Sequence, residues 1–187
     1  MPAPAEPTMT RKPIKRVLAI DPFSRGVGFA VFEGPEKLID WGLKTTGRAD
    51  NAKAVRVIEA LIGRFRPDVL ALENWGSAGS RRCQRIDLLL NHIASGESKR
   101  LRVRLVSRRE IRAIGPMPQT GTKYGRASLL TERFPELLPF LPPIRKIWMS
   151  EDDRMSIFDA VAFAVACFPP ETENPEPSLL EKTDMLE

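Results

Sequence analysis

The chain has 187 residues, 42% of them hydrophobic, and a formal net charge of +5. This length and composition suit a single hydrophobic core, and no run of about 18 apolar residues is present that would cross a membrane. The two cysteines, Cys83 and Cys167, lie far apart, which argues against a disulfide framework and a CxxC zinc site. We therefore expect a cytoplasmic protein without a membrane partner.

The positive charge is concentrated in the body of the chain. Residues 169–187 hold six acidic residues against one lysine, so the rest of the chain carries a net charge of +10. We predict that this acidic, proline-rich tail and the leader at residues 1–15 are disordered, and that residues 16–168 form one domain. A body this basic favours a polyanionic partner such as nucleic acid, and a solvated basic surface is the alternative.

Two apolar runs near the N-terminus, at residues 17–20 and 27–32, predict a β-hairpin, because the segment between them contains proline and glycine. The first run is apolar at every position, as in a central strand, and Asp21 follows it directly. We therefore expect Asp21 on a rigid support where the strand leaves the core, although an Asp before Pro22 can also simply cap a turn. Residues 37–43 predict a third strand, at the outside of an antiparallel meander.

A helix and a second buried strand follow. Apolar residues at steps of three and four predict an amphipathic helix over residues 52–66, which Pro67 ends. Residues 68–73 predict an apolar strand that also ends in an acid, Glu73. The loop of small residues after it contains Trp75, which we expect to be exposed.

The next part of the chain predicts helices around one more strand. In chain order, the pattern predicts a helix at 81–94, a strand at 101–106, a short helix at 107–114, a long loop at 115–125 and a helix at 126–134. Ser107 and Glu110 have the spacing of a capping box at the start of the short helix.

The final helix carries an acid in an apolar setting. The S-x-x-D pattern from Ser150 to Asp153 predicts a capping box at its start, and the apolar residues up to 166 predict burial against the sheet. Asp159 interrupts this apolar surface. Burying an unpaired carboxylate costs about several kcal/mol, so Asp159 requires a cation or hydrogen bonds, and a purely structural salt bridge is the alternative to a functional role.

The order of these elements, together with three short motifs, resembles the RuvC family of Holliday-junction resolvases. The motifs are IDPFSRGVGFAV at 20–31, LALE at 70–73 and DAVAFA at 159–164. The resemblance covers about residues 17–166. It implies a ribonuclease H-like α/β fold: a mixed five-stranded sheet, made of an antiparallel three-strand meander plus parallel strands, flanked by helices.

The resemblance also implies a metal site. By their positions in the motifs, Asp21, Glu73 and Asp159 match the catalytic, metal-binding acids of the family, which implies two Mg²⁺ or Mn²⁺ ions with Asp21 as the bridging ligand. Where family members usually have another Asp, this chain has Ser156. Asp152 lies on the same side of the predicted helix but about 10 Å along it from Asp159, so it cannot simply replace the missing ligand. Asp152 and Ser156 are the two positions considered for an additional acid.

Contacts to nucleic acid are expected from other residues. Trp75 is a candidate for stacking on an unpaired junction base, and anchoring of its loop is the equally weighted alternative. Basic residues near the motifs are candidates for backbone contacts: Arg81, Arg82, Arg85, Lys123 and Arg126.

The leading hypothesis is a metal-dependent, structure-selective endonuclease that cuts branched DNA such as Holliday junctions, working as a homodimer because the junction presents symmetric strands. A catalytically weak or inactive nucleic-acid-binding protein of the same fold is the first alternative, and Ser156 is its main support. A nuclease acting on structured RNA also fits the motifs. An actin-like ATPase fits least, because no later D-x-G phosphate loop follows the hairpin.

Overall fold

The computed structural model describes residues 16–48, 50–76, 83–97, 100–112, 122–146 and 148–168. The predicted leader and acidic tail lie outside these ranges, and so do Arg81, Arg82 and most of the predicted loop at 115–125.

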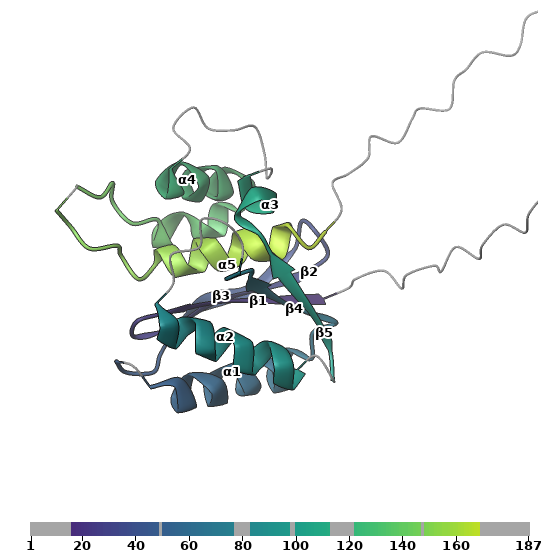
Figure 1. The fold of residues 1–187 in the computed structure, drawn as a ribbon. Helices are drawn as coiled ribbons and strands as arrows, with labels where there is room; N and C mark the ends of the chain where they lie inside the picture. The colour runs from purple at the N-terminus through teal and green to yellow at the C-terminus, as the bar shows by residue number, and fades with distance from the viewer. Residues whose placement is uncertain are drawn as a thin grey trace, which may run out of the picture.

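A mixed five-stranded sheet forms the centre of the fold (Figure 1). Its strands lie in the order β3-β2-β1-β4-β5, where β1 to β2 and β2 to β3 pair antiparallel, and β1 to β4 and β4 to β5 pair parallel. The strand bounds are Arg16–Phe23 for β1, Gly26–Glu33 for β2, Leu38–Thr45 for β3, Val69–Glu73 for β4 and Arg102–Val106 for β5. The predicted meander with added parallel strands is confirmed.

The β1–β2 hairpin is tighter than the sequence suggested. Its ladder runs along the full length of both strands and leaves a two-residue turn at 24–25. Asp21 therefore lies inside β1, opposite Gly28, and the prediction that it follows the strand is wrong. The parallel pairing of β1 with β4, however, stops at Ile20 and Leu72, so Asp21 is one residue beyond it.

Helices cover both faces of the sheet, as Figure 1 shows. Helices α1 (Asn51–Phe65) and α2 (Gln84–Glu97) lie on one face. The other face carries α3 (Arg108–Arg112), α4 (Lys123–Arg133), the short 3₁₀ helix η1 (Pro135–Phe140) and α5 (Met155–Val165). None of the helices in the described ranges has the length and apolar character needed to cross a membrane.

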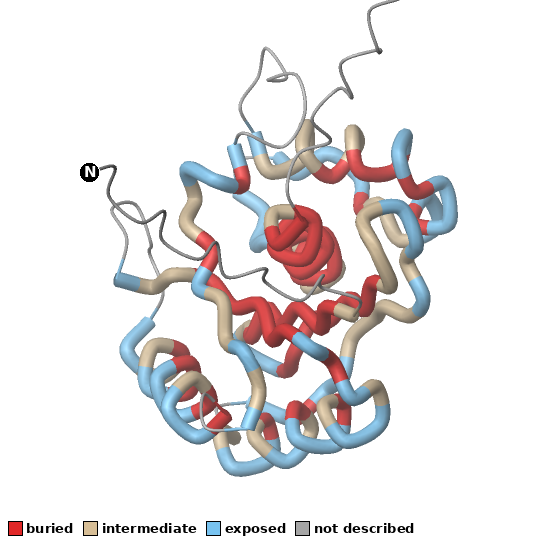
Figure 2. The backbone as a smooth tube through the Cα atoms, turned by 90° about the vertical axis from the view of Figure 1, so that its right-hand side faces the viewer, coloured by how far each residue is buried: buried red, intermediate tan, exposed pale blue. Residues whose placement is uncertain are grey.

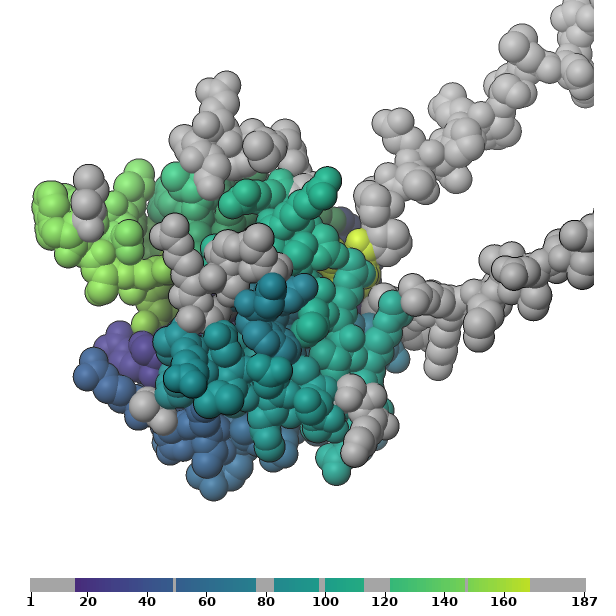
Figure 3. All heavy atoms as spheres, in the orientation of Figure 1, coloured from purple at the N-terminus to yellow at the C-terminus, as the bar shows by residue number. Residues whose placement is uncertain are grey.

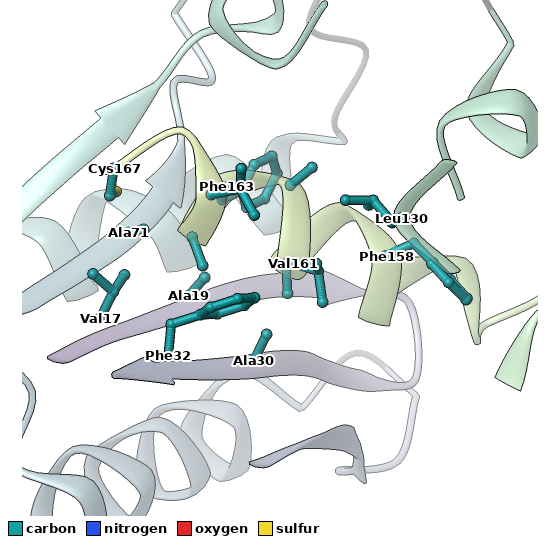
Figure 4. Packing of buried hydrophobic residues seen from close by; sticks show 14 of the residues in the cluster. Val17, Ala19, Ala30, Phe32, Ala71, Leu130, Phe158, Val161, Phe163 and Cys167 are labelled. Carbon is teal, nitrogen blue, oxygen red and sulfur yellow. The ribbon is translucent and has the colours of Figure 1, made fainter. Parts of the chain in front are cut away.

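Two hydrophobic clusters pack on the opposite faces of the sheet, because successive side chains of a strand point to opposite sides. In β1, Val17 and Ala19 contact the cluster around α5, and we call this side the α5 face (Figure 4). Leu18 and Ile20 contact the cluster on the side of α1 and α2, the α1–α2 face. In β4, Ala71 and its odd-numbered neighbours likewise belong to the α5 face.

Helix α5 is buried along its whole length, and in Figure 2 it is the red helix that lies on the sheet. This confirms the prediction that the apolar final helix packs against the sheet. A helix that is apolar on all sides is typical of such a central position.

The predicted start of this helix is wrong. The helix begins at Met155 and not at Ser150, and Arg154 at its N-cap makes no side-chain capping bond. The carboxylate of Asp152 instead accepts hydrogen bonds from Arg154, and Asp153 forms an ion pair with Arg25 in the β1–β2 turn at 2.7 Å. These acids pair with arginines, which replaces the capping role that the S-x-x-D pattern suggested.

Candidate active site

Asp21 and Glu73 lie next to each other at one edge of the α5 face. Each acid comes two residues after an alanine that faces α5, Ala19 in β1 and Ala71 in β4, and each lies one residue beyond the last β1–β4 pair. Asp21 is 3% exposed and Glu73 is 2% exposed. Two neighbouring carboxylates this deeply buried require hydrogen bonds or positive charges as compensation.

Ser156 of α5 provides part of this compensation for Asp21. Its Oγ lies 2.6 Å from the backbone oxygen of Asp21 and 2.8 Å from the carboxylate Oδ2, and its single hydroxyl proton is donated to one of them at a time. The contact depends on Gly28, because a Cβ at that position would lie only 2.4 Å from Ser156 Oγ and 2.5 Å from its backbone oxygen. The resemblance implies an acid at position 156. This chain instead has the Ser156 hydroxyl there, and it contacts Asp21.

Asp159 lies one helical turn after Ser156 and is 9% exposed. Its carboxylate pairs with Lys123 Nζ at 2.8 Å and lies 3.7 Å from a guanidinium nitrogen of Arg126. The prediction that Asp159 requires a compensating cation is confirmed. Both cations were predicted as nucleic-acid contacts, and the structure places them at the acids.

Helix α4 carries these two cations to the site. It begins at Lys123, three residues before the predicted start at Arg126, because the Thr122 hydroxyl accepts a hydrogen bond from the backbone N–H of Gly125 at 3.0 Å. Gly125 lies in the first turn of α4, and because glycine is unfavourable in helices, the sequence pattern placed the start after it.

Lys123 connects several acids through its ammonium group. In addition to Asp159, its Nζ contacts Glu151 Oε1 at 2.6 Å. Burial disfavours the charged form of Lys123, but the charge of Asp159, hydrogen bonds to Asp159 and Glu151, and the charge of Asp21 outweigh burial and raise its pKa above the ordinary value. Lys123 is therefore a protonated cation at neutral pH.

Glu73 has a cationic neighbour that the sequence analysis missed. Arg108, the first residue of α3, places Nε 3.2 Å from Glu73 Oε1. The predicted capping box fixes the start of α3: Ser107 N–H donates to Glu110 Oε2 at 2.7 Å, and Glu110 N–H donates back to Ser107 Oγ. The hydrogen bond from Ser107 also holds the pKa of Glu110 below its ordinary value. The available signal was a basic residue two positions after the end of β5, the strand that neighbours β4.

The donor set matches a hard divalent cation in its chemistry, because carboxylate oxygens are the preferred ligands of Mg²⁺ and Mn²⁺. In the described ranges, however, no three His, Cys, Asp or Glu side chains are grouped so that they could hold a metal ion. The three predicted acids each have a hydroxyl or a cation as a neighbour instead. The structure thus brings the acids to one region of the α5 face without forming a coordination shell.

Three other predicted residues take part in internal contacts. Asp152 pairs with Arg154 at 2.8 Å. Trp75 is partly buried and packs against the cluster of the α1–α2 face, so the prediction of an exposed ring is wrong. Arg85 donates hydrogen bonds to the Asn51 side chain at 2.5 Å and to a backbone oxygen of β1 at 3.2 Å, and thereby ties α2 to α1 and to the hairpin.

Comparison with known proteins identifies the fold. No family model and no curated protein sequence matches the chain. The structure is similar to RuvC of T. thermophilus in complex with a Holliday junction substrate, with a TM-score of 0.52 and 16% sequence identity over 81% of this chain and 90% of that one. It is equally similar to a second structure of Thermus thermophilus RuvC, with a TM-score of 0.52 and 17% identity over 81% of this chain and 92% of that one. The ribonuclease H-like fold implied by the motifs is confirmed, and the chain has the fold of RuvC-like resolvases.

Proposed function

We propose that the chain is a metal-dependent, structure-selective endonuclease that hydrolyses phosphodiester bonds in branched DNA such as Holliday junctions. The observation that carries this proposal is the buried pair Asp21 and Glu73, each one residue beyond the last pair of the two adjacent strands β1 and β4. Asp159 of α5 contacts Lys123, whose pKa is also raised by the charge of Asp21. Apolar residues at these positions would serve folding as well or better, so the buried acids point to chemistry. The fold shared with a RuvC that was solved with a Holliday junction substrate supports the choice of DNA.

We propose Asp21, Glu73 and Asp159 as the residues that would hold divalent ions, Mg²⁺ or Mn²⁺. When bound, divalent ions supply an activated water and stabilise the leaving oxygen of the phosphodiester. Ser156 contributes a neutral oxygen beside Asp21 and fixes the direction of its carboxylate.

The cations of the site have two tasks in this proposal. In the protein without metal, Lys123, Arg126 and Arg108 balance the charge of the acids. When DNA binds, the same cations can contact phosphate oxygens, because they are charged at neutral pH and lie beside the acids. The acids and the cations thus form one unit that holds metal and phosphate at the same place.

A four-way junction presents equivalent strands, and paired cuts require two active sites, so we propose that a homodimer acts in the cytoplasm.

The main alternative is a DNA-binding protein of the same fold that does not cut. Two observations favour it: Ser156 stands where the resemblance implies an acid, and the Lys123 ammonium contacts Asp159. A third possibility, cleavage of structured RNA, uses the same residues on another substrate.

The test is incubation of the full chain with labelled four-way junction, duplex DNA, single-stranded DNA and structured RNA, in Mg²⁺, in Mn²⁺ and in chelator. We expect the wild type to cut the junction in Mg²⁺ or Mn²⁺ and not in chelator. We expect the Asp21→Asn variant to bind the junction without cutting it. Glu36→Gln is the matched control, because Glu36 is an exposed acid that pairs with Arg133 at the opposite end of β2. Binding without cleavage in every condition would support the non-cutting alternative. Cleavage of the structured RNA and of none of the DNAs would show that the substrate is RNA and not branched DNA.

A further inference from the structure

A cavity of about 830 Å³ lies beside the acids. The start of α4, the segment before α5 and Arg25 of the β1–β2 turn form its walls. Figure 1 shows this segment, drawn in yellow-green between η1 and α5, extending away from the sheet, and Figure 3 shows it at the same edge of the molecule as the purple hairpin. Lys123 lines the cavity and also contacts Asp159, so the cavity opens directly next to the candidate active site. Its volume lies within the range of small-ligand sites.

The walls of the cavity offer flat and apolar surfaces. They include the ring of Tyr124 and the side chains Pro142, Pro143, Ile144 and Met149. Ile144 is 72% exposed and Met149 is 47% exposed. Apolar side chains that gather around a cavity without being covered mark a binding surface for a partly apolar ligand.

The charged side chains of the cavity wall balance one another, because Arg25, Lys123 and Arg145 line it together with three acids. Its three acids are paired with neighbouring cations, Glu151 with Lys123, Asp152 with Arg154 and Asp153 with Arg25. An anion within the cavity therefore gains no net attraction from its walls, whereas a flat uncharged ring with N–H groups can contact the apolar side chains and donate hydrogen bonds to the carboxylates. Arg145, which also lines the cavity, has no ion pair within the part of the chain that the structure describes and is free to contact a backbone phosphate outside.

We propose that this cavity receives an unpaired nucleobase of the bound DNA strand, while the neighbouring phosphate lies at the acids. The proposal rests on the proposed function in taking DNA as the ligand. Tyr124 provides the stacking surface, and the prolines complete the walls. A bulged base enters without the loss of a base pair. A base at a branch point lacks one stacking neighbour, so it unpairs at a lower cost than a base within a duplex, and the cavity selects branched over fully paired linear DNA.

The test compares two DNA duplexes that differ by one unpaired nucleotide, a bulged duplex and its fully paired counterpart. Their dissociation constants are measured with the full chain in chelator, so that no cleavage occurs. The wild-type chain should prefer the bulged duplex, and Tyr124→Ala should weaken binding of the bulged duplex about tenfold while leaving the paired duplex unchanged. Tyr124→Phe, which keeps the ring, should bind like the wild type. No preference in the wild type, or an equal loss for both duplexes, would overturn the proposal.

A second variant tests the cavity without touching a helix. Ile144 is exposed, so Ile144→Asp should fold normally and, by placing a carboxylate at the wall, should also reduce the preference for the bulged duplex. Leu88→Ala, at an exposed position of α2 on the α1–α2 face, is the control and should leave the preference unchanged. An Ile144→Asp variant with the full wild-type preference would contradict the proposal.

The two proposals fail in different ways. If the wild type prefers bulged DNA, Tyr124→Ala loses this preference and no DNA is cut in Mg²⁺ or Mn²⁺, the base cavity stands and the nuclease proposal fails. If the wild type cuts junctions while Tyr124→Ala binds and cuts them equally well, the nuclease proposal stands and the base cavity is refuted.

Discussion

The two faces of the sheet differ in the side chains that β1 and β4 place on them. On the α1–α2 face, β1 and β4 pack large apolar side chains against the helices, which are Leu18, Ile20, Leu70 and Leu72. On the α5 face the same strands present small residues that allow α5 to pack closely, and Asp21 and Glu73 follow these residues just beyond the last β1–β4 pair. Because successive side chains of a strand point to opposite faces, two short strands can place packing residues on one face of the sheet and the candidate catalytic acids on the other. Substitutions on the two faces should therefore have different consequences.

The largest effect on stability should come from the α1–α2 face. Leu70 is fully buried, so Leu70→Ala should lower the free energy of unfolding by about 2 to 5 kcal/mol through lost burial and a cavity. On the opposite face, the α5 face, Glu73→Gln should abolish cleavage while lowering the free energy of unfolding much less. Denaturant unfolding with a junction-cleavage assay measures both. If Glu73→Gln unfolds as easily as Leu70→Ala, the separation between the faces does not hold.

A smaller effect is expected where the α5 face is packed most tightly. Gly28→Ala should cost about 1 to 3 kcal/mol and reduce cleavage, because the added Cβ would push Ser156 and α5 away from Asp21. Gly63→Ala is the matched control: Gly63 lies inside α1 with no atom within 4 Å of an added Cβ, and alanine there should stabilise the helix by about 1 kcal/mol. Thermal unfolding of both variants measures the contrast. Equal stability of the two alanine variants would mean that α5 tolerates a shift.

Trp75 tests whether the α1–α2 face contributes to substrate binding. Because its ring packs against that cluster, Trp75→Ala should lose about 1 to 3 kcal/mol of stability while the preference for junction over duplex DNA remains. Competition binding with the two DNAs and a melting curve measure both effects. A variant with normal stability and no junction preference would restore the stacking role for Trp75.

The smallest change in stability should come from Ser156→Ala. The substitution removes one hydrogen bond to Asp21 in a buried site and should cost about 1 kcal/mol, but it removes a contact that orients the Asp21 carboxylate and should lower the rate of metal-dependent cleavage. The rate and the melting temperature, taken together, separate positioning from stability. Cleavage at the wild-type rate would show that Ser156 only packs.

The strands and their acids could be predicted from the sequence because the information is local. Four consecutive apolar residues before Asp21, and the apolar run before Glu73, are enough to predict strands that are buried on both faces. The need of Asp159 for a cation follows equally from its apolar surroundings.

The partners of the acids depend on tertiary contacts, and the sequence pattern did not reveal them. Arg108 reaches Glu73 only because β5 lies beside β4, and Ser156 reaches Asp21 only because Gly28 leaves room for it. The start of α5 was predicted wrongly for a similar reason. The S-x-x-D pattern is common to turns and helix starts, and arginines distant in sequence or adjacent to the turn bind its acids here.

The most direct test of the proposed metal site is a titration of the full chain with Mn²⁺, in which binding is monitored by electron paramagnetic resonance. The central claim is that Asp21, Glu73 and Asp159 form one divalent-cation site. We expect that the wild type binds Mn²⁺, that Asp21→Asn, Glu73→Gln and Asp159→Asn each weaken binding by about tenfold or more, and that Glu36→Gln leaves it unchanged. A wild-type chain that binds no Mn²⁺, or three variants that bind it as tightly as the wild type, would contradict the claim.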